Sequence, residues 1–547
     1  MKKPNSLHIF DDADFPISLV RKNFFYGTGY DIAELSQKPL VGIVNSQTDI
    51  NPGHMHLDTI ANRVKEGVHA AGGIPFEFSV PAPCDGMTEG HEGMRYVLAQ
   101  RDLIADIVET HVRSMRYDGL VCVAGCDKIV PGMIMAVARL RMPALFITGG
   151  PNTWLIRYHS SMKGPVDHKY YDDLMDKLAT GTCATCGACE LMGTANTMQC
   201  LTEALGLSLP RSANAPAYHS EKLMFARRAG MRIVEMIEEG LSSDKILTMK
   251  AMENALVVDL AIGGSTNTTL HLPAFAHSAG LDLPLSRFND FNKKVPTICG
   301  ISPSGPYGIT DLYIAGGIPA VMKRIADDLH LDALTVSGQT IGDIVSVAQV
   351  TDEKVIPDRN SPFFPEGGTV VLFGNLAPEG AVVKQSAVAK EYLSFTGKAR
   401  IFESEHDCLA AIREKTIRPG QVVVIRNEGP RGGPGMPETL AVTMGLELSG
   451  VEGVALITDG RFSGATAGPC VGHVSPEAYA LGPIAALREG DEIVIDIPRR
   501  RLEVKLPDSE IKKRLEGWKA PERDVPAGYM RRYRRLVSSA AKGAVLD

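Results

Sequence analysis

The chain has 547 residues, of which 44% are hydrophobic and 22% are charged, and this balance is ordinary for a globular protein with a substantial core. Its formal net charge of −7 argues against nucleic acid or an anionic membrane surface as the main partner. Ten cysteines are too few for a disulfide scaffold, so we expect reduced thiols and a cytoplasmic location. No apolar run approaches the ~20 residues of a membrane span. Acidic residues interrupt the first twenty positions, so we expect no secretion signal.

Strand and helix patterns alternate over the first 150 residues. The expected strands cover 40–46, 74–82, 117–125 and 142–150, and the expected helices cover 56–72, 92–115 and 131–141. This alternation predicts an α/β fold with a doubly wound parallel sheet covered by helices on both faces. Ligands of such sheets bind beyond the carboxyl ends of the strands. The strand-to-helix turns are therefore where we expect the chemistry.

The second half of the chain has a different pattern. Helices and glycine-rich loops continue to about residue 350, and short strands then follow at 369–374, 399–404, 421–426, 454–460, 492–498 and 501–506. Helical patterns interrupt these strands near 406–415 and 436–446. We therefore expect two domains, an N-terminal α/β domain (1–360) and a C-terminal β-rich domain (361–547) with a barrel-like or sandwich core.

Two of the expected strand ends carry thiols beside acidic side chains. GCDKIVPGM (125–133) contains Cys126, Asp127 and Lys128, and PAPCDGMTEGHEGM (81–94) contains Cys84, Asp85, Glu89, His91 and Glu92. A surface Asp–Lys pair and a solvated loop are the alternative interpretations. Oxygen ligands favour Mg²⁺ or Mn²⁺, whereas thiolates favour iron–sulfur clusters or zinc. The sequence offers both kinds of ligand at one sheet edge.

GTCATCGACELMGTANTM (181–198) places three cysteines, Cys183, Cys186 and Cys189, at intervals of three residues. The spacing is typical of a ferredoxin-type iron–sulfur run. The residues from 190 onward have a helical pattern, so we expect Cys189 at a helix N-terminus, where exposed amides favour a thiolate. We expect Cys200, inside that helix, to be a small buried hydrophobe.

Two loops in the β-rich half are also candidates. VVVIRNEGPRGGPGMPE (422–438) carries Glu428 and Glu438, and GVALITDGRFSGAT (453–466) carries Ser463. A serine in a glycine-rich turn is usually a turn residue. Neither a nearby histidine nor a nucleophile elbow indicates a hydrolase.

CDKIVPGMIMA (126–136) and ALITDGRFSGAT (455–466) resemble the signature motifs of the dihydroxy-acid dehydratase and sugar-acid/phosphogluconate dehydratase family. The resemblance extends through GHEGMRY, TANTMQCLTEALGLSLP, VVDLAIGGSTNTTLHLPA, GNLAPEGAVVKQSAV and EGPRGGPGMPE. By position, it implies iron–sulfur ligands at Cys126 and Cys189 and a catalytic base at Ser463. It implies Mg²⁺ ligands at Asp85, Asp127, Lys128 as its carbamate, and Glu438. Glu92 is a further candidate ligand.

This chain departs from the family at one ligand position. Many members have a Pro-Cys pair that supplies a third cluster ligand, whereas this sequence reads NPGH, with Gly53 in the cysteine's place. We expect Cys84, next to Asp85, to be the third ligand, with Cys122 as a weaker candidate. Both a [2Fe–2S] and a [4Fe–4S] cluster are compatible with three thiolates and one open iron.

The resemblance implies β-elimination of water from a 2,3-dihydroxy carboxylate, giving a 2-oxo acid. We favour 2,3-dihydroxy-3-methylbutanoate and its ethyl homologue as substrates, in valine and isoleucine synthesis. A sugar acid is the alternative, because Gly193 stands where the branched-chain enzymes usually carry an aromatic residue. A non-catalytic iron–sulfur carrier or a zinc scaffold built on the three spaced cysteines is a more distant alternative. The family also implies a homodimer.

Overall fold

The computed structural model describes residues 2–154, 180–463, 466 and 468–546, and it confirms the predicted fold class. The N-terminal part contains a parallel sheet with the strand order β2 (Ile74–Ser79), β1 (Leu40–Asn45), β3 (Gly119–Ala124) and β4 (Ala144–Thr148). β1, β3 and β4 are buried along their whole length. Their sequences read as nearly continuous apolar runs because helices cover both faces of the sheet.

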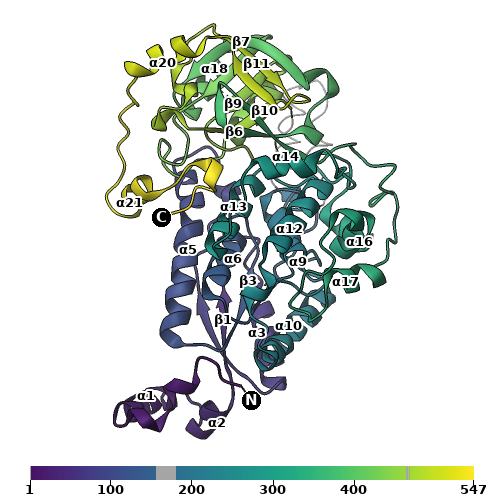
Figure 1. Cartoon of the computed structure of the whole chain (residues 1–547), viewed down its shortest axis with the longest axis vertical. Coiled ribbons are helices and arrows are strands. Elements are labelled where there is room, and N and C mark those ends of the chain that lie inside the picture. Colours follow the sequence, from purple (N-terminus) through teal and green to yellow (C-terminus); the bar gives the residue numbers. More distant parts are fainter. Residues whose placement is uncertain (1, 155–179, 464–465, 467, 547) are drawn as a thin grey trace.

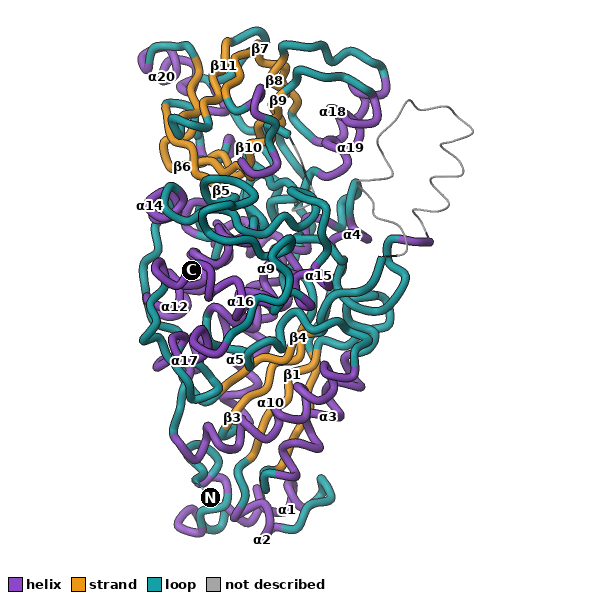
Figure 2. Tube along the Cα trace, turned by 90° about the vertical axis from the view of Figure 1, so that its right-hand side faces the viewer, coloured by secondary structure: helices purple, strands orange, loops and turns teal. Residues whose placement is uncertain are grey.

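The two helical layers cover opposite faces of the sheet (Figures 1 and 2). α3 (Leu57–Ala70) packs against α10 (Ser220–Glu239) on one face, and α5 (Met94–Met115) packs against α6 (Ile129–Leu140) on the other. The chain leaves β1 toward β2 on one side and then returns past β1 to β3 on the other side. The strand order therefore reverses between β1 and β3, and such a switch point is where doubly wound sheets bind ligands.

Further helices surround this sheet. They are α1 (Ile17–Tyr26), α2 (Ile32–Gln37), α4 (Asp85–Thr88), α9 (Thr194–Ala204), α11 (Ser243–Ile246), α12 (Met249–Ile262), α13 (Thr268–Ala279), α14 (Ser286–Asn292), α15 (Ile309–Ile314), α16 (Gly317–Arg324) and α17 (Ile341–Val347). Short 3-10 helices lie at Leu7–Ile9, Asp12–Asp14, Ala326–Asp328, Gln385–Ala387, Lys390–Tyr392, Ala478–Ala480, Pro483–Ala486 and Ala540–Lys542. Among the residues described, none of the helices has the length and apolar character needed to cross a membrane.

The C-terminal part closes into a barrel, which lies at the top of Figure 1. Its strands within the described residues are, in order around the barrel, β10 (Cys470–Ser475), β6 (Ala377–Lys384), β5 (Thr369–Gly374), β12 (Arg501–Val504), β11 (Glu492–Asp496), β7 (Ser394–Phe402), β8 (Gln421–Ile425) and β9 (Ala455–Thr458). α18 (Glu405–Arg413) and α19 (Leu440–Ser449) pack together beside it, and α20 (Asp508–Glu516) follows β12. Of the two cores considered from the sequence, the barrel is the one observed.

The end of the chain returns from the barrel to the N-terminal part. α21 (Tyr529–Leu536) contacts α5, and both lie on the same side of Figure 1. Tyr533 belongs to a small apolar cluster with Leu98 of α5 and Met436 of the loop after β8. The returning segment therefore packs on both parts of the molecule next to the loop that carries Glu438.

One local expectation was wrong. The helix expected to start at Cys189 starts at Thr194, because Gly193 is in an extended conformation at its N-cap. The five residues before it form a turn, and the side-chain amide of Asn196 donates hydrogen bonds to the carbonyls of Cys189 and Leu191. Cys189 therefore lies in a loop that the helix holds from its first turn.

Candidate active site and metal centre

The loops that follow β1, β2 and β3 meet at the switch point. The loop after β1 contains Gly53, and the loop after β3 begins at Gly125. A Cβ atom built on Gly125 would lie 2.7 Å from the Gly53 carbonyl oxygen, which is closer than a real side chain tolerates. Glycine at position 125 therefore allows the two loops to touch. This contact sets the Cys126 thiol directly against the loop after β1.

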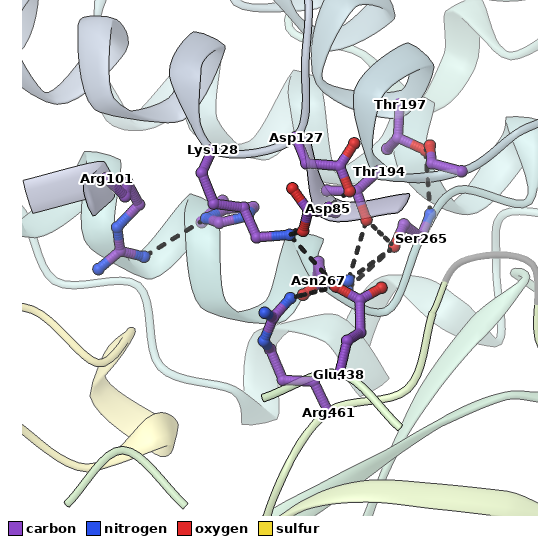
Figure 3. A network of polar contacts seen from close by, with 12 residues as sticks. Asp85, Arg101, Asp127, Lys128, Thr194, Thr197, Ser265, Asn267, Glu438 and Arg461 are labelled. Carbon is purple, nitrogen blue, oxygen red and sulfur yellow. Dashed lines mark hydrogen bonds and ion pairs between the residues drawn. The ribbon is translucent and has the colours of Figure 1, made fainter. Parts of the chain in front are cut away.

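Three carboxylates from distant parts of the sequence converge beside this junction. One ligand oxygen from each of Asp85, Asp127 and Glu438 lies within 4.8 Å of the others. Asp85 begins α4 after β2, Asp127 follows β3, and Glu438 comes from the loop before α19 of the barrel part. Figure 3 shows the three side chains pointing toward one another. The site is therefore assembled from both parts of the molecule.

Lys128 lies in the middle of these carboxylates. Its Nζ is 2.6 Å from Asp85, 3.3 Å from Glu438 and 3.4 Å from Asp127, and the side chain is fully buried. Burial and the nearby Arg461 cation lower the pKa of Lys128, but the three carboxylates outweigh them and hold this pKa above its ordinary value. The ammonium group is thus the local cation of the triad.

Burial perturbs the carboxylates of this site. It raises the pKa of Asp85 to about 7, with Lys128 opposing and Asp127 and Glu438 adding to the rise. The Asp85 Oδ1 atom is buried and has no hydrogen-bond partner. For Glu438, burial is outweighed by the Lys128 and Arg461 cations, which hold its pKa below the usual value. Carboxylate oxygens crowded together, one of them without a partner, are a donor set that fits Mg²⁺.

Arg461 and Glu89 also lie at this site, although neither was predicted to have a role there. The fully buried Arg461 donates from Nη1 to Glu438 at 2.5 Å. Burial raises the pKa of Glu89 to about 9, and the nearby Glu438 and Asp85 charges add to the rise. Arg461 stands in the motif that supplied Ser463, so its charge was the available signal, but only the fold shows that it reaches Glu438.

The thiols of Cys84, Cys126 and Cys189 lie close enough to one another for their charges to interact. Cys126 is buried, and its Sγ donates to Asn51 Oδ1 at 3.6 Å. Burial raises the pKa of Cys84 to about 11. Cys183, which is not among the cluster ligands that the resemblance implies, is hydrogen-bonded to Cys189, and this bond lowers the pKa of Cys183 to about 7.

Position 53 lies directly against the cluster of thiols. A Cβ atom on Gly53 would be 2.5 Å from Cys126 Sγ, so the Cys126 thiol occupies the space that a side chain at position 53 would need. Among the described residues, the group with three ligand atoms within 4.8 Å is the carboxylate triad and not the thiols. Sulfur ligands of one tetrahedral zinc ion stand about 3.8 Å apart.

The remaining predicted residues fall into two groups. Ser463 follows β9 two residues after Arg461, and its carbonyl accepts a hydrogen bond from Thr466 N at 3.0 Å; residues 464, 465 and 467 of this loop lie outside the described part of the chain. Glu92 is exposed and lines a separate surface cavity of about 540 Å³ with Arg95 and Arg523. The structure brings Ser463 to the segment that contacts the triad, and it does not bring Glu92 to the triad.

The chain matches two family models, the dihydroxy-acid/6-phosphogluconate dehydratase N-terminal model over residues 38–344 and the corresponding C-terminal model over residues 354–544. It is 49% identical to a dihydroxy-acid dehydratase of Acetivibrio thermocellus over 96% of both chains. It is 48% identical to a dihydroxy-acid dehydratase of Caldanaerobacter subterraneus subsp. tengcongensis, again over 96% of both chains. A dihydroxy-acid dehydratase of Methanococcoides burtonii is 48% identical over 93% of this chain and 95% of its own.

Proposed function

Because the chain belongs to the dihydroxy-acid/6-phosphogluconate dehydratase family, and is therefore a hydro-lyase, we propose which substrates it dehydrates. These are 2,3-dihydroxy-3-methylbutanoate and 2,3-dihydroxy-3-methylpentanoate, which it converts to 2-oxo acids in valine and isoleucine synthesis. The observation that carries the proposal is the near-full-length similarity to proteins named dihydroxy-acid dehydratase. The buried carboxylates beside a group of thiols provide the matching chemistry.

Asp85, Asp127 and Glu438 would hold Mg²⁺. The three carboxylates carry three negative charges, and the buried Lys128 and Arg461 carry two positive ones. A divalent cation added to this set would leave an excess of positive charge in a buried site, which is costly. Carbamylation of Lys128, which the resemblance implies, removes one positive charge and adds a carboxylate. Carbamylation therefore favours Mg²⁺ binding in two ways: it lowers the positive charge of the site, and it supplies an oxygen ligand.

Cys126 and Cys189 would hold an iron–sulfur cluster, with Cys84 as the third ligand. The support for Cys84 is its electrostatic coupling to both other thiols and the lack of space for a thiol at Gly53. Cys183 is the competing thiol, because it is bonded to Cys189. The [2Fe–2S] and [4Fe–4S] forms both remain compatible with three thiolates.

The reaction requires a base for the Cα proton and help for hydroxide to leave. When bound, Mg²⁺ and an open iron would supply Lewis acidity to the substrate's carboxylate and hydroxyl oxygens. The chain's own contribution is Ser463, which would take the Cα proton. A serine hydroxyl is a weak base, so its proton affinity must be set by neighbouring cations. Arg461, two residues away and buried, is a suitable neighbour.

The test is 2-oxo acid formation by anaerobically purified protein, with and without Mg²⁺, from the branched dihydroxy acid and from a C5 or C6 sugar acid. Faster turnover of the branched acid supports the proposal. Turnover of neither substrate by protein that contains iron would contradict it.

A sugar acid is the second candidate substrate. Gly193, at the N-cap of α9, has no side chain, and a Cβ atom there would meet only Leu191 Cδ1 at 2.8 Å, the end of a flexible side chain. Position 193 could therefore hold a larger residue. Because glycine stands there, space is left near Thr194. If this room admits a longer polyol, Gly193→Phe should lower sugar-acid turnover more than branched-acid turnover.

We also propose that the protein works as a cytoplasmic homodimer on a small dihydroxy carboxylate, with no nucleic acid or membrane partner. Support for self-association comes from large apolar side chains exposed near the N-terminus, including Phe15 and Phe24, which are 73% and 74% exposed. Large apolar side chains exposed on one short segment are common at protein interfaces. Light scattering after size exclusion should give twice the chain mass, and Phe24→Glu should shift the protein toward the monomer.

A further inference from the structure

Arg461 connects the two parts of the molecule at the carboxylate triad. Its guanidinium makes hydrogen bonds in three directions: Nη1 to Glu438 at 2.5 Å, Nη1 to Asn267 Oδ1 at 2.9 Å, and Nε to the Met436 carbonyl at 2.7 Å. Glu438 and Met436 belong to the barrel part, whereas Asn267 precedes α13 of the N-terminal part. One rigid side chain therefore holds a metal-ligand candidate from one part against the other (Figure 3).

The backbone reinforces this arrangement. Glu438 and Arg461 form an isolated parallel β-bridge, in which Arg461 N donates to the Pro437 carbonyl at 3.1 Å and Thr439 N donates to the Arg461 carbonyl at 2.9 Å. The bridge fixes the relative position of the two residues along their loops. Because Ser463 follows on the same segment, a shift of Arg461 would move the proposed base as well.

Asn267 extends the contact into the N-terminal part. Its side-chain amide donates to Thr194 Oγ1 at 2.9 Å, and this hydroxyl is bonded to Ser265 Oγ at 2.9 Å. Ser265 N in turn donates to Thr197 Oγ1 at 3.1 Å. Asn267, Thr194, Ser265 and Thr197 are all buried. The chain of hydrogen bonds therefore anchors the guanidinium to the first turn of α9, directly after the loop of Cys189.

Two roles are consistent with these contacts, and they predict opposite effects on the metal. If Arg461 only neutralised Glu438, its positive charge would compete with a divalent cation, and removing or weakening it would strengthen metal binding. If Arg461 fixes the position of Glu438, loss of the planar fork would weaken metal binding even where the charge is kept. The three-directional contact favours the second role, because neutralisation alone needs one ion pair and not two further hydrogen bonds.

We infer that Arg461 is a positioning residue, which holds the Glu438 carboxylate of the barrel part in register with Asp85 and Asp127 and is itself anchored by Asn267. The inference rests on the proposed function in one respect, the use of these three carboxylates as a divalent-metal site. Residues that orient metal ligands typically contribute about 10–100-fold to metal affinity. Lysine in place of Arg461 keeps the charge but carries its donors on one nitrogen, so it cannot replace both the Nε bond to Met436 and the Nη1 bonds to Glu438 and Asn267.

The experiment is a titration of the full-length, anaerobically purified protein with Mn²⁺, following the free ion by its electron paramagnetic resonance signal. Arg461→Lys should bind Mn²⁺ at least tenfold more weakly than the wild type. Asn267→Ala, which leaves both the guanidinium and Glu438 in place, should weaken it severalfold. The matched control is Arg101→Lys, because Arg101 is equally buried but is paired with Asp102. Its affinity for Mn²⁺ should not change, although its melting temperature should fall.

Each outcome decides one question. Wild-type affinity in both Arg461→Lys and Asn267→Ala, or tighter binding in Arg461→Lys, would overturn the positioning role while leaving the metal site in place. If Arg461→Lys does not fold, wild-type affinity in Asn267→Ala alone overturns it. If the wild type binds no Mn²⁺, the metal site itself is wrong and the inference fails with it. Weakening that Arg101→Lys shares equally would show a general effect of instability and would also overturn the role.

Discussion

Lys128→Met offers a direct test of how the triad is stabilised without metal. The substitution removes the cation that lies within 2.6–3.4 Å of the buried Asp85 and Glu438 carboxylates and the half-buried Asp127 carboxylate, and it replaces this cation with an apolar chain of similar length. Removing one partner of a buried ion pair typically costs about 3–5 kcal/mol. Arg461 still contacts Glu438, so we expect a loss near the lower end of that range, about 3 kcal/mol, and a lower melting temperature in EDTA.

Divalent metal should reverse this loss. With the ammonium group gone, Arg461 is the one buried cation left beside the triad among the described residues. Mg²⁺ should therefore raise the melting temperature of Lys128→Met more than that of the wild type without bicarbonate. Differential scanning fluorimetry in EDTA, in Mg²⁺, and in Mg²⁺ with bicarbonate measures these effects. Bicarbonate should increase the Mg²⁺ effect in the wild type alone, because only Lys128 can form a carbamate.

The reasoning fails if Lys128→Met melts like the wild type in EDTA, since the ammonium group would then contribute nothing to the folded triad. It also fails if Mg²⁺ stabilises the variant no more than it stabilises the wild type. Lys222→Met is a useful comparison, because Lys222 is also fully buried but lies at the Thr148 and Ser212 loops away from the triad. That variant should be destabilised in the same way with and without Mg²⁺.

Four further predictions concern the site and the barrel. Cys84→Ser should lower the iron content per chain of anaerobically purified protein. If Cys84→Ser keeps its iron and Cys183→Ser loses it, the third ligand is Cys183 and not Cys84. Ser463→Ala should abolish 2-oxo acid formation with iron and Mg²⁺ binding retained, and residual activity above a few per cent would exclude it as the base. Glu438→Gln should lower Mn²⁺ affinity by at least tenfold without changing iron content. Burial raises the pKa of Asp459 to about 6, so between about pH 4 and pH 6 the folded state keeps a proton that the unfolded state releases. The contribution of Asp459 to the free energy of unfolding is therefore fully present below about pH 4 and is lost as the pH rises to about 6. Urea unfolding across that window should show a steeper loss in the wild type than in Asp459→Asn, and parallel curves would contradict the shift.

Most of the N-terminal fold could be predicted from the sequence because β1, β3 and β4 are buried along their whole length. Leu40–Asn45 and Gly119–Ala124 read as uninterrupted apolar runs, and amphipathic helices separate them. The barrel was harder to predict. β10 (Cys470–Ser475) contains Gly472 and a histidine with positive φ at His473, and its pairing with β6 shifts register there. An irregular strand of this kind has no clear alternation, so only its pairing partners show that it belongs to the sheet.

The residues of the candidate site fall into the same two groups, those that local sequence pattern could predict and those that it could not. Asp85, Asp127 and Cys126 follow recognisable strands, and parallel strands bring their carboxyl ends to one edge, so local pattern was sufficient to group them. Glu438 and Ser463 came from the family resemblance, because nothing local in a glycine-rich loop indicates where it folds back. Arg461 could not be predicted, since an arginine in a loop is usually solvated and its burial is a property of the assembled domains.

The distribution of ligand candidates between the two parts has a consequence for assembly. Cys84, Cys126, Cys183 and Cys189 all lie on loops of the N-terminal part, whereas the carboxylate triad is complete only when the barrel part contributes Glu438. With the proposed ligands, the N-terminal part alone would hold the cluster, whereas a divalent cation would need both parts in register. Because Glu438 pairs with Arg461 in an isolated β-bridge and Ser463 follows two residues later, placing Glu438 at the triad would also place the proposed base. With the proposed roles, metal binding and catalytic competence would be coupled by the geometry of one loop pair.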